Sequence, residues 1–234
     1  TVTAGVPVLT TQIEPETAIA TDIGYRYQGK AVTASVTFFN VDFKNRQSNA
    51  FDPDTLKNVY TNAGKTTKRG LEFEGGTALM GGLSGYLSAT VQEDKMKNDL
   101  RVSATQVLPT TGKTYTLLPK YMAGASLQYA SGPLYMRLKA KYTGKQWATL
   151  MNDEEVPSYT LMDFDAGYKF ADMGMLKSPL VRFNISNLGN AGYRNPSSGS
   201  VTNAVAVGTR TAQTVFYYMG APRLASVTFS ADFQ

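Results

Sequence analysis

The chain has 234 residues, no cysteine, no histidine, and a formal net charge of +5 from 23 Lys and Arg against 18 Asp and Glu. Without cysteine and histidine, disulfides, thiol chemistry, zinc fingers and every catalytic triad that uses imidazole are excluded. No apolar run approaches the roughly 18 residues of a membrane helix, so a helical membrane protein is excluded too. So mild a positive charge predicts no nucleic-acid partner, and no motif predicts a cofactor or a metal site.

The dominant pattern along the chain is an alternation of apolar with small or polar residues, which is typical of strands with two unlike faces. Residues 1–16 have no sustained period and are predicted to form a loop that enters the fold, with structure beginning near Thr17. The alternation blurs at Phe39, Val41 and Phe43, which predicts a β-bulge or an exchange of faces there. In all we expect nine strands, which begin near residues 17, 31, 67, 83, 120, 134, 159, 180 and 221.

The connections between these strands alternate short and long, which gathers the short turns at one end of the sheet. Tight turns are predicted near 28–30, 80–82 and 131–133, whereas 45–66 and 190–220 are long polar loops. This meander is typical of up-and-down outer-membrane barrels. The expected strands, 10 to 14 residues long, exceed the roughly five or six residues common in soluble proteins and suit a tilted crossing of a bilayer.

A soluble sandwich and a membrane barrel predict the same alternation, so the aromatic positions are needed to choose between them. Aromatic side chains stand mostly at strand ends on the apolar face, as in the girdles at membrane interfaces. The middle of that face carries many Ala, Gly and Thr residues, which would fill a sandwich core poorly. Both observations favour a barrel; the aromatic positions are Tyr25, Tyr27, Tyr121, Tyr129, Tyr142, Tyr168, Phe170 and Phe233.

The opposite face is densely charged, which suits a water-filled or plugged lumen. Its members are Arg26, Glu72, Glu74, Arg137, Lys139, Lys141, Asp163, Asp165 and Arg182. Two hypotheses explain the basic stripe formed by Arg137, Lys139 and Lys141. The three cations pair with Asp163 and Asp165 on a neighbouring strand, or they form an electropositive wall that draws anionic solute inward, and both can hold.

Five short stretches, taken in their order and spacing, resemble the C-terminal part of the barrel of a TonB-dependent outer-membrane receptor of the siderophore-receptor type. They are EPET (14–17) leading to DIGYRY (22–27), FFNVDFKNR (38–46), RGLEFEG (69–75), LPK (118–120), and NLGN (187–190) with Tyr193. The terminal strand ending at Phe233 resembles the signal read by the barrel-insertion machinery, although Gln234 follows the usual terminal aromatic residue.

The resemblance implies an all-β fold, an antiparallel up-and-down transmembrane β-barrel of roughly twenty-two strands with a plugged lumen. Residues 17–234 would supply the C-terminal nine or so strands, with the plug domain and the first strands absent. An odd, open sheet would leave two unpaired edges in lipid. We therefore expect a fragment of a receptor, or one piece of a split receptor, that pairs with the remainder of the same barrel.

By the same resemblance, the protein lies in the outer membrane of a Gram-negative bacterium, in contact with its lipid and lipopolysaccharide. It would not be an enzyme but would take up a scarce solute, most often a ferric siderophore, energised by the TonB complex through an N-terminal plug. Aromatic and Arg residues in the long loops suit an anionic, ring-bearing chelate. The candidate solute contacts, each with loop packing or interface anchoring as the alternative, are Tyr60, Trp147, Arg194, Arg210, Tyr217 and Tyr218.

Other functions remain open at this stage. Vitamin, saccharide or other metal-chelate cargo fits the same architecture. A passive porin or structural barrel is the main alternative, and it would need a complete, even-stranded chain without a plug. An outer-membrane lipase or protease would need an unusual catalytic set, because histidine is absent.

Overall fold

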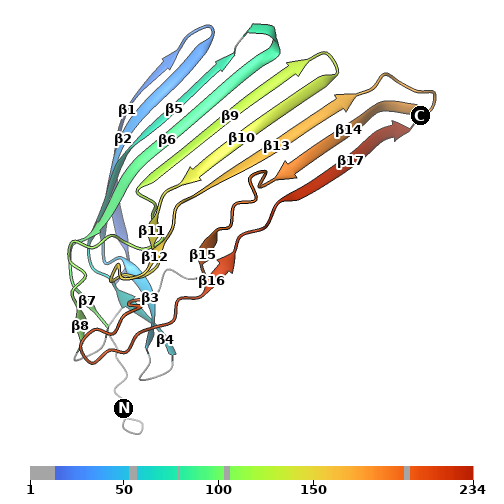
Figure 1. The fold of residues 1–234 in the computed structure, drawn as a ribbon. Helices are drawn as coiled ribbons and strands as arrows, with labels where there is room; N and C mark the ends of the chain where they lie inside the picture. The colour runs from blue at the N-terminus through green and yellow to red at the C-terminus, as the bar shows by residue number, and fades with distance from the viewer. Residues whose placement is uncertain (1–13, 53–56, 79, 103–105, 198–200, 234) are drawn as a thin grey trace.

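The computed structural model describes residues 14–52, 57–78, 80–102, 106–197 and 201–233. In this part of the chain, nine long strands form one antiparallel sheet in the order β1-β2-β5-β6-β9-β10-β13-β14-β17, an open, curved wall (Figure 1). The strands are β1 (Thr17–Gln28), β2 (Val32–Lys44), β5 (Thr66–Ala78), β6 (Leu83–Met96), β9 (Tyr121–Ser131), β10 (Leu134–Thr143), β13 (Tyr159–Lys169), β14 (Leu176–Ser186) and β17 (Leu224–Phe233). The predicted meander is therefore confirmed.

The long connections carry short hairpins that the sequence did not indicate. Figure 1 shows these hairpins at one end of the sheet, whereas the short turns and the end of β17 lie at the other. The pairs are β3 (Gln47–Asp52) with β4 (Lys57–Asn62), β7 (Leu100–Arg101) with β8 (Val107–Leu108), β11 (Gln146–Trp147) with β12 (Glu155–Val156), and β15 (Arg194–Pro196) with β16 (Tyr217–Met219). A 3-10 turn, η1 (Met80–Gly82), fills one short connection. Within the described ranges, no helix is long and apolar enough to cross a membrane.

Some strand boundaries differ from the prediction. The last strand begins at Leu224 instead of residue 221, because the backbone N–H of Arg223 donates to Asn190 Oδ1 at 2.9 Å and not to a neighbouring strand. Strand β14 begins at Leu176, and its register with β17 shifts between Lys177 and Leu180. Of the predicted entry loop, residues 14–16 have no regular structure, and 1–13 lie outside the described residues, as does residue 234.

The predicted bulge or exchange of faces in β2 is wrong. Strand β2 pairs with β5 in unbroken register from Val32 opposite Thr77 to Phe43 opposite Thr66. Phe39 and Phe43 therefore stay on the lumen side. Phe39 is buried. Its ring packs closely over Gly70, where a Cβ would lie only 2.7 Å from the ring. The outward positions change from apolar to polar instead, so the pattern marks the place where the strand leaves the hydrocarbon.

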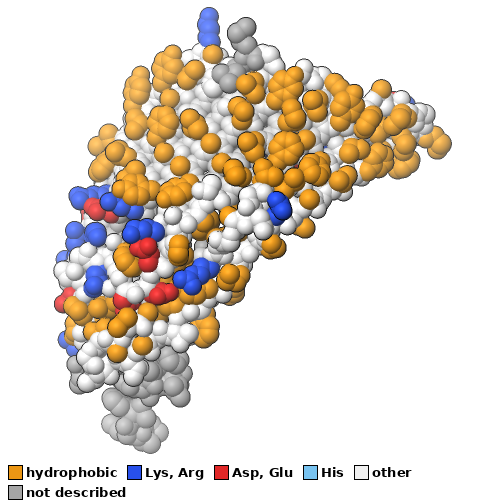
Figure 2. Space-filling model, in the orientation of Figure 1, with side chains coloured by type: hydrophobic (Ala, Val, Ile, Leu, Met, Phe, Trp, Pro, Cys, Tyr) orange, Lys and Arg blue, Asp and Glu red, His pale blue; other side chains and the backbone are white. Residues whose placement is uncertain are grey.

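One face of the sheet is an exposed apolar belt. Figure 2 shows hydrophobic side chains spread over this face of the sheet. Ile23 is 69% exposed and Val227, near the other edge, is 69% exposed as well. In the part that the structure describes, no second sheet packs on the belt. Soluble proteins rarely expose so large an apolar surface, so the barrel alternative, with lipid against this face, is favoured over the sandwich.

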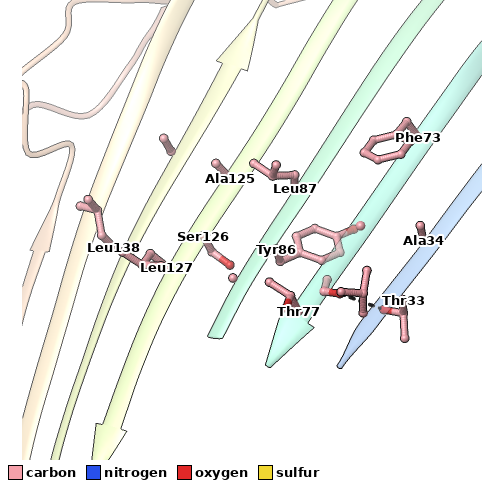
Figure 3. Close-up of a pocket in the computed structure, with 15 residues that line it drawn as sticks. Thr33, Ala34, Phe73, Thr77, Tyr86, Leu87, Ala125, Ser126, Leu127 and Leu138 are labelled. Carbon is pink, nitrogen blue, oxygen red and sulfur yellow. Dashed lines mark hydrogen bonds between the residues drawn. The ribbon is translucent and has the colours of Figure 1, made fainter. Parts of the chain in front are cut away.

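Small residues open a hollow of about 540 Å³ within the belt. Figure 3 shows Phe73, Leu87 and Leu138 on three strands, with the short side chains of Ala34 and Ala125 beside them. The lining is almost wholly apolar. In a soluble core such a space would leave the neighbouring side chains without contacts, whereas lipid tails can fill it.

The buried apolar cluster lies among the long connections and includes the last residue of β6, Met96. Its members are Ala63, Met96, Leu100, Val102, Leu108 and Leu150, which come from four separate segments. Tyr115, Met151 and Val207 pack against them. Because the apolar face of the sheet points outward, this cluster gives the loop layer a hydrophobic core of its own.

A buried ion pair joins this loop layer to the strands. Arg46 Nη1 lies 2.5 Å from Asp94 Oδ2 and 2.7 Å from Thr66 Oγ1. The guanidinium also lies 4.4 Å from the ring centre of Phe43 and 3.7 Å from that of Tyr115. The side chain of Asp94 is 2% exposed, so this carboxylate depends on Arg46 for its ion pair, while Thr66 Oγ1 accepts a second hydrogen bond from the same guanidinium.

The face assignment can be tested at two adjacent positions of β10. Leu138 lies in the belt opposite Leu127 and Phe164, whereas Lys139 lies on the lumen side. We expect Leu138→Arg to destabilise the membrane-inserted fold by roughly 2–4 kcal/mol, because the guanidinium would enter the hydrocarbon. Lys139→Arg should leave it unchanged. Urea titration of folding into bilayers measures both variants, and equal tolerance would contradict the assignment.

The ion pair predicts a second stability difference. Asp94→Ala leaves Arg46 without its buried partner, and we expect a loss of about 3 kcal/mol in the free energy of unfolding. The control is Glu93→Gln, which breaks an exposed pair with Arg69 and should cost less than about 1 kcal/mol. Protease susceptibility of the long connections and thermal unfolding report both. A loss of similar size in the two variants would be inconsistent with a special role for Arg46 and Asp94.

Candidate functional site

The basic stripe lies on the lumen side of β10. Arg137 is opposite Asp165, and its Nη2 lies 3.8 Å from Asp165 Oδ1. The same carboxylate lies 3.4 Å from Nη2 of Arg182 on β14. Asp165 is only 6% exposed, so two cations share one buried carboxylate. The predicted cross-strand pairing is therefore confirmed for Arg137.

The other two cations of the stripe are open to the lumen. Lys139 is opposite Asp163, but that carboxylate accepts the backbone N–H of Asn187 at 2.9 Å. Lys141 is opposite Leu161. Among the described residues, neither ammonium group has a carboxylate within ion-pair distance. Both are exposed and line a depression of about 480 Å³ in the wall, as the second hypothesis for the stripe requires.

Aromatic rings stack where this wall meets the loop layer. Tyr159, the first residue of β13, lies on the same side of the sheet as Asp163 because the two are four residues apart in one strand. Its ring stacks on that of Tyr193 at 4.7 Å, with 25° between the planes. The absence of a side chain at Gly220 permits this position of Tyr193, since a Cβ there would collide with its ring.

On the face of the β15–β16 hairpin opposite to Tyr193, Glu154 receives two partners from that hairpin. The Tyr217 hydroxyl donates to Glu154 Oε1 at 2.6 Å, and Arg194 Nη2 lies 3.7 Å from the same oxygen. The Arg194 guanidinium lies 4.3 Å from the ring centre of Tyr217. Burial raises the pKa of the Tyr217 hydroxyl to about 12, and the Glu154 carboxylate adds to the shift. The phenol is therefore a neutral donor at physiological pH. We call Glu154, Tyr159, Tyr193, Arg194 and Tyr217 the mouth cluster.

Two further predicted contacts lie near the mouth cluster but differ in orientation. Trp147 in β11 is half-buried and pairs across the hairpin with Glu155, the chain neighbour of Glu154. Tyr218 follows Tyr217 in β16, so its side chain points to the opposite face of that strand. It is 69% exposed. Of the six predicted contacts, Arg194 and Tyr217 touch one another and Trp147 lies on the neighbouring hairpin.

The remaining two candidates are Arg210 and Tyr60. Arg210 is 6% exposed, and its Nε donates to Thr202 Oγ1 at 3.1 Å and to Asn203 Oδ1 at 3.0 Å. This arrangement is what the loop-packing alternative expects. Tyr60 lies in β4, and its side chain is outside the described residues. A solute contact by either residue stays a prediction.

The sequence reasoning missed the acidic residues that organise this region. Glu154 connects Arg194 to Tyr217, and the adjacent Asp153 accepts hydrogen bonds from the backbone N–H groups of Ala204 and Val205 at 2.9 and 3.0 Å. The available signal was the acidic run at 153–155 in the long connection between β10 and β13. Among the described side chains, no group of three or more carboxylates gathers in a metal-binding arrangement.

Comparison with known proteins shows where this architecture belongs. Residues 2–188 match the family model described as TonB dependent receptor-like, beta-barrel. The ferrioxamine receptor of Yersinia enterocolitica is 30% identical over 187 residues, which cover 77% of this chain and 24% of that protein. The chain thus spans about a quarter of the length of this curated relative.

Solved structures share the fold at lower identity. The ferric citrate transporter FecA, in its unliganded form, superposes with a TM-score of 0.70 at 21% identity, over 92% of this chain and 31% of that one. The ferric yersiniabactin uptake receptor FyuA from Yersinia pestis gives 0.68 at 19% identity, over 94% of this chain and 30% of that one. Because the family model covers most of the sequence, the chain belongs to the TonB dependent receptor-like β-barrel family of Gram-negative outer-membrane proteins.

Proposed function

We propose that this chain is part of a receptor that takes up a ferric chelate across the outer membrane, energised through TonB. The observation that carries the proposal is the mouth cluster, an Arg and stacked aromatic rings set above the open cations of the lumen wall. The relatives support it: one is named a ferrioxamine receptor and others are named for ferric citrate and ferric yersiniabactin. Uptake of this kind makes and breaks no covalent bond, so no catalytic group is proposed.

The chemistry of the mouth cluster suits an anionic chelate. The Arg194 guanidinium can form charge-assisted hydrogen bonds with carboxylate, phenolate or hydroxamate oxygens. The rings of Tyr159, Tyr193 and Tyr217 offer flat apolar surface to the organic part of a chelate. Below them, Lys141 and Lys139 lie two residues apart on the same face of β10. They would continue the positive potential along the path inward.

The proposed functional unit contains more strands than this sheet. In the described part of the chain, β1 and β17 are edge strands, each paired on one side only. Unpaired backbone groups in hydrocarbon cost several kcal/mol each. We propose that the remaining strands of the same barrel pair with both edges, and that a plug preceding them contacts the TonB complex. Membrane lipid and lipopolysaccharide would contact the belt.

Growth on defined iron sources tests the transport proposal. With the full-length gene deleted, we expect growth to fail on one ferric chelate and to persist on unchelated iron. Expression should rise when iron is limiting. The copper transporter OprC has a similar fold, with a TM-score of 0.65, so copper accumulation is the control for another cargo. If neither expression nor uptake responds to iron, the ferric-chelate proposal fails.

Two tyrosine substitutions, one in the mouth cluster and one in the belt, test the mouth cluster. Tyr217→Phe removes the hydroxyl bound to Glu154, so the carboxylate turns to Arg194 and competes with the solute for its guanidinium. We expect the affinity of the complete receptor for its chelate to fall about fivefold, which corresponds to the net contribution of about 1 kcal/mol of one ordinary hydrogen bond. Tyr25→Phe removes the same group from the lipid-facing side of β1 and should leave affinity unchanged. Fluorescence quenching or calorimetry measures both, and equal effects would contradict the site.

A further inference from the structure

The apolar belt ends, toward the long connections, in a row of charged side chains that also face outward. Arg69 of β5 has the same parity as Leu71, and its cross-strand partner Glu93 has the same parity as Val91. Lys120 precedes β9, and its Nζ lies 5.3 Å from the ring centre of Tyr121. Figure 2 shows Lys, Arg, Asp and Glu side chains gathered directly beside the belt near the ends of the first strands. The lipid-facing wall is therefore charged at this one level.

A hollow of about 270 Å³ spans the boundary between belt and charge. On its apolar side lie Phe38, Leu71 and Val91, which are 40%, 53% and 46% exposed. On its charged side lie Arg69, Glu93 and Lys120. The hollow thus offers an apolar surface and two cations within one site, which suits a ligand with an anionic group attached directly to hydrocarbon. A free inorganic anion would leave the apolar half uncovered.

The charges at this level sum to a positive site. Glu93 accepts a hydrogen bond from Arg69 Nε at 2.8 Å, which compensates one cation. Lys120 is exposed, and Lys95 donates to Thr114 Oγ1 at 3.1 Å. A further acid on the outward face, Asp42, accepts hydrogen bonds from Thr67 at 2.7 Å and Asn40 at 2.9 Å. Lys120 and the exposed side of Arg69 therefore remain available to an anion.

The position of the hollow identifies the leaflet. In barrels of this class the short turns are periplasmic and the longer loops extracellular, and the hollow lies toward the long connections. It therefore faces the outer leaflet, whose lipid is lipopolysaccharide, with phosphate groups on a sugar that carries several acyl chains. We propose that this hollow, which we name the boundary site, binds lipopolysaccharide. A phosphate contacts Arg69 and Lys120 while an acyl chain lies on Phe38, Leu71 and Val91.

The boundary site is separate from the solute path. Arg69 and Leu71 lie on the outward side of β5, whereas the open cations Lys139 and Lys141 lie on the lumen side of β10. A solute in the lumen does not reach the outward face. Lipid binding at the boundary site can therefore be lost while chelate uptake is kept, and the two proposals fail independently.

Native mass spectrometry of the complete receptor, extracted in mild detergent, tests the boundary site. The probe is hexa-acylated lipopolysaccharide of the rough type, added back to delipidated receptor. We expect the apparent affinity to fall about fivefold in Lys120→Gln and again in Arg69→Gln, as for cations near an anionic lipid surface. Glu93→Gln should retain or strengthen binding, because it releases Arg69. Lys139→Gln is the matched control on the lumen side and should bind lipid as the unaltered receptor does.

Two comparisons identify the chemistry that is bound. Lipopolysaccharide stripped of its lipid A phosphates should bind more weakly by a similar factor, and millimolar inorganic phosphate should not displace the intact lipid. Urea titration separates loss of lipid from loss of fold. Equal lipid affinity in Lys120→Gln, Arg69→Gln and Lys139→Gln would overturn the proposal, as would full displacement by inorganic phosphate.

Discussion

Every backbone N–H and C=O group that enters hydrocarbon must be paired within the protein, and the architecture of this chain follows from that requirement. It explains why β2 keeps one register with β5 over its whole paired length, even where the side-chain pattern changes. It also explains why irregular backbone lies at the two ends of the sheet, with the short hairpins at one of them, beyond the apolar belt. Side chains could then vary freely along the strands, provided that each face matched its solvent.

Because lipid takes the place of a core against the outward face, the buried interactions concentrate in the loop layer. The apolar cluster around Met96 and Leu100, the Arg46–Asp94 pair and the hydrogen bonds of Asp153 all lie there. They join connections that are far apart in the sequence. The hydrophobic effect and the buried ion pair thus hold the mouth cluster in place, while the bilayer holds the strands.

The strands and their faces could be predicted because period-two alternation is set locally, by the two solvents on either side of a strand. The same alternation gave a wrong prediction at Phe39. This apolar residue lies on the lumen side because its ring packs over Gly70, and the register of β2 with β5 has no bulge there. The hairpins and the mouth cluster could not be predicted. Glu154 acquires its role only when Arg194 and Tyr217, 40 and 63 positions further on, fold back to it, and no local pattern encodes that encounter. The candidates Arg194 and Tyr217 were found from residue type, whereas the acid that binds both was not.

The carboxylate of Glu154 also bears on how long a cargo would stay bound. The Arg194 guanidinium already interacts with that oxygen and with the Tyr217 ring. The binding free energy of an arriving anion is therefore reduced by the interaction with Glu154 that it replaces. Such internal competition lowers the barrier to dissociation, because Glu154 reclaims the guanidinium as the anion departs. A receptor must deliver what it captures. If Arg194 binds the cargo as proposed, the competing carboxylate of Glu154 would favour rapid transfer inward, toward Lys141, over prolonged retention at the surface.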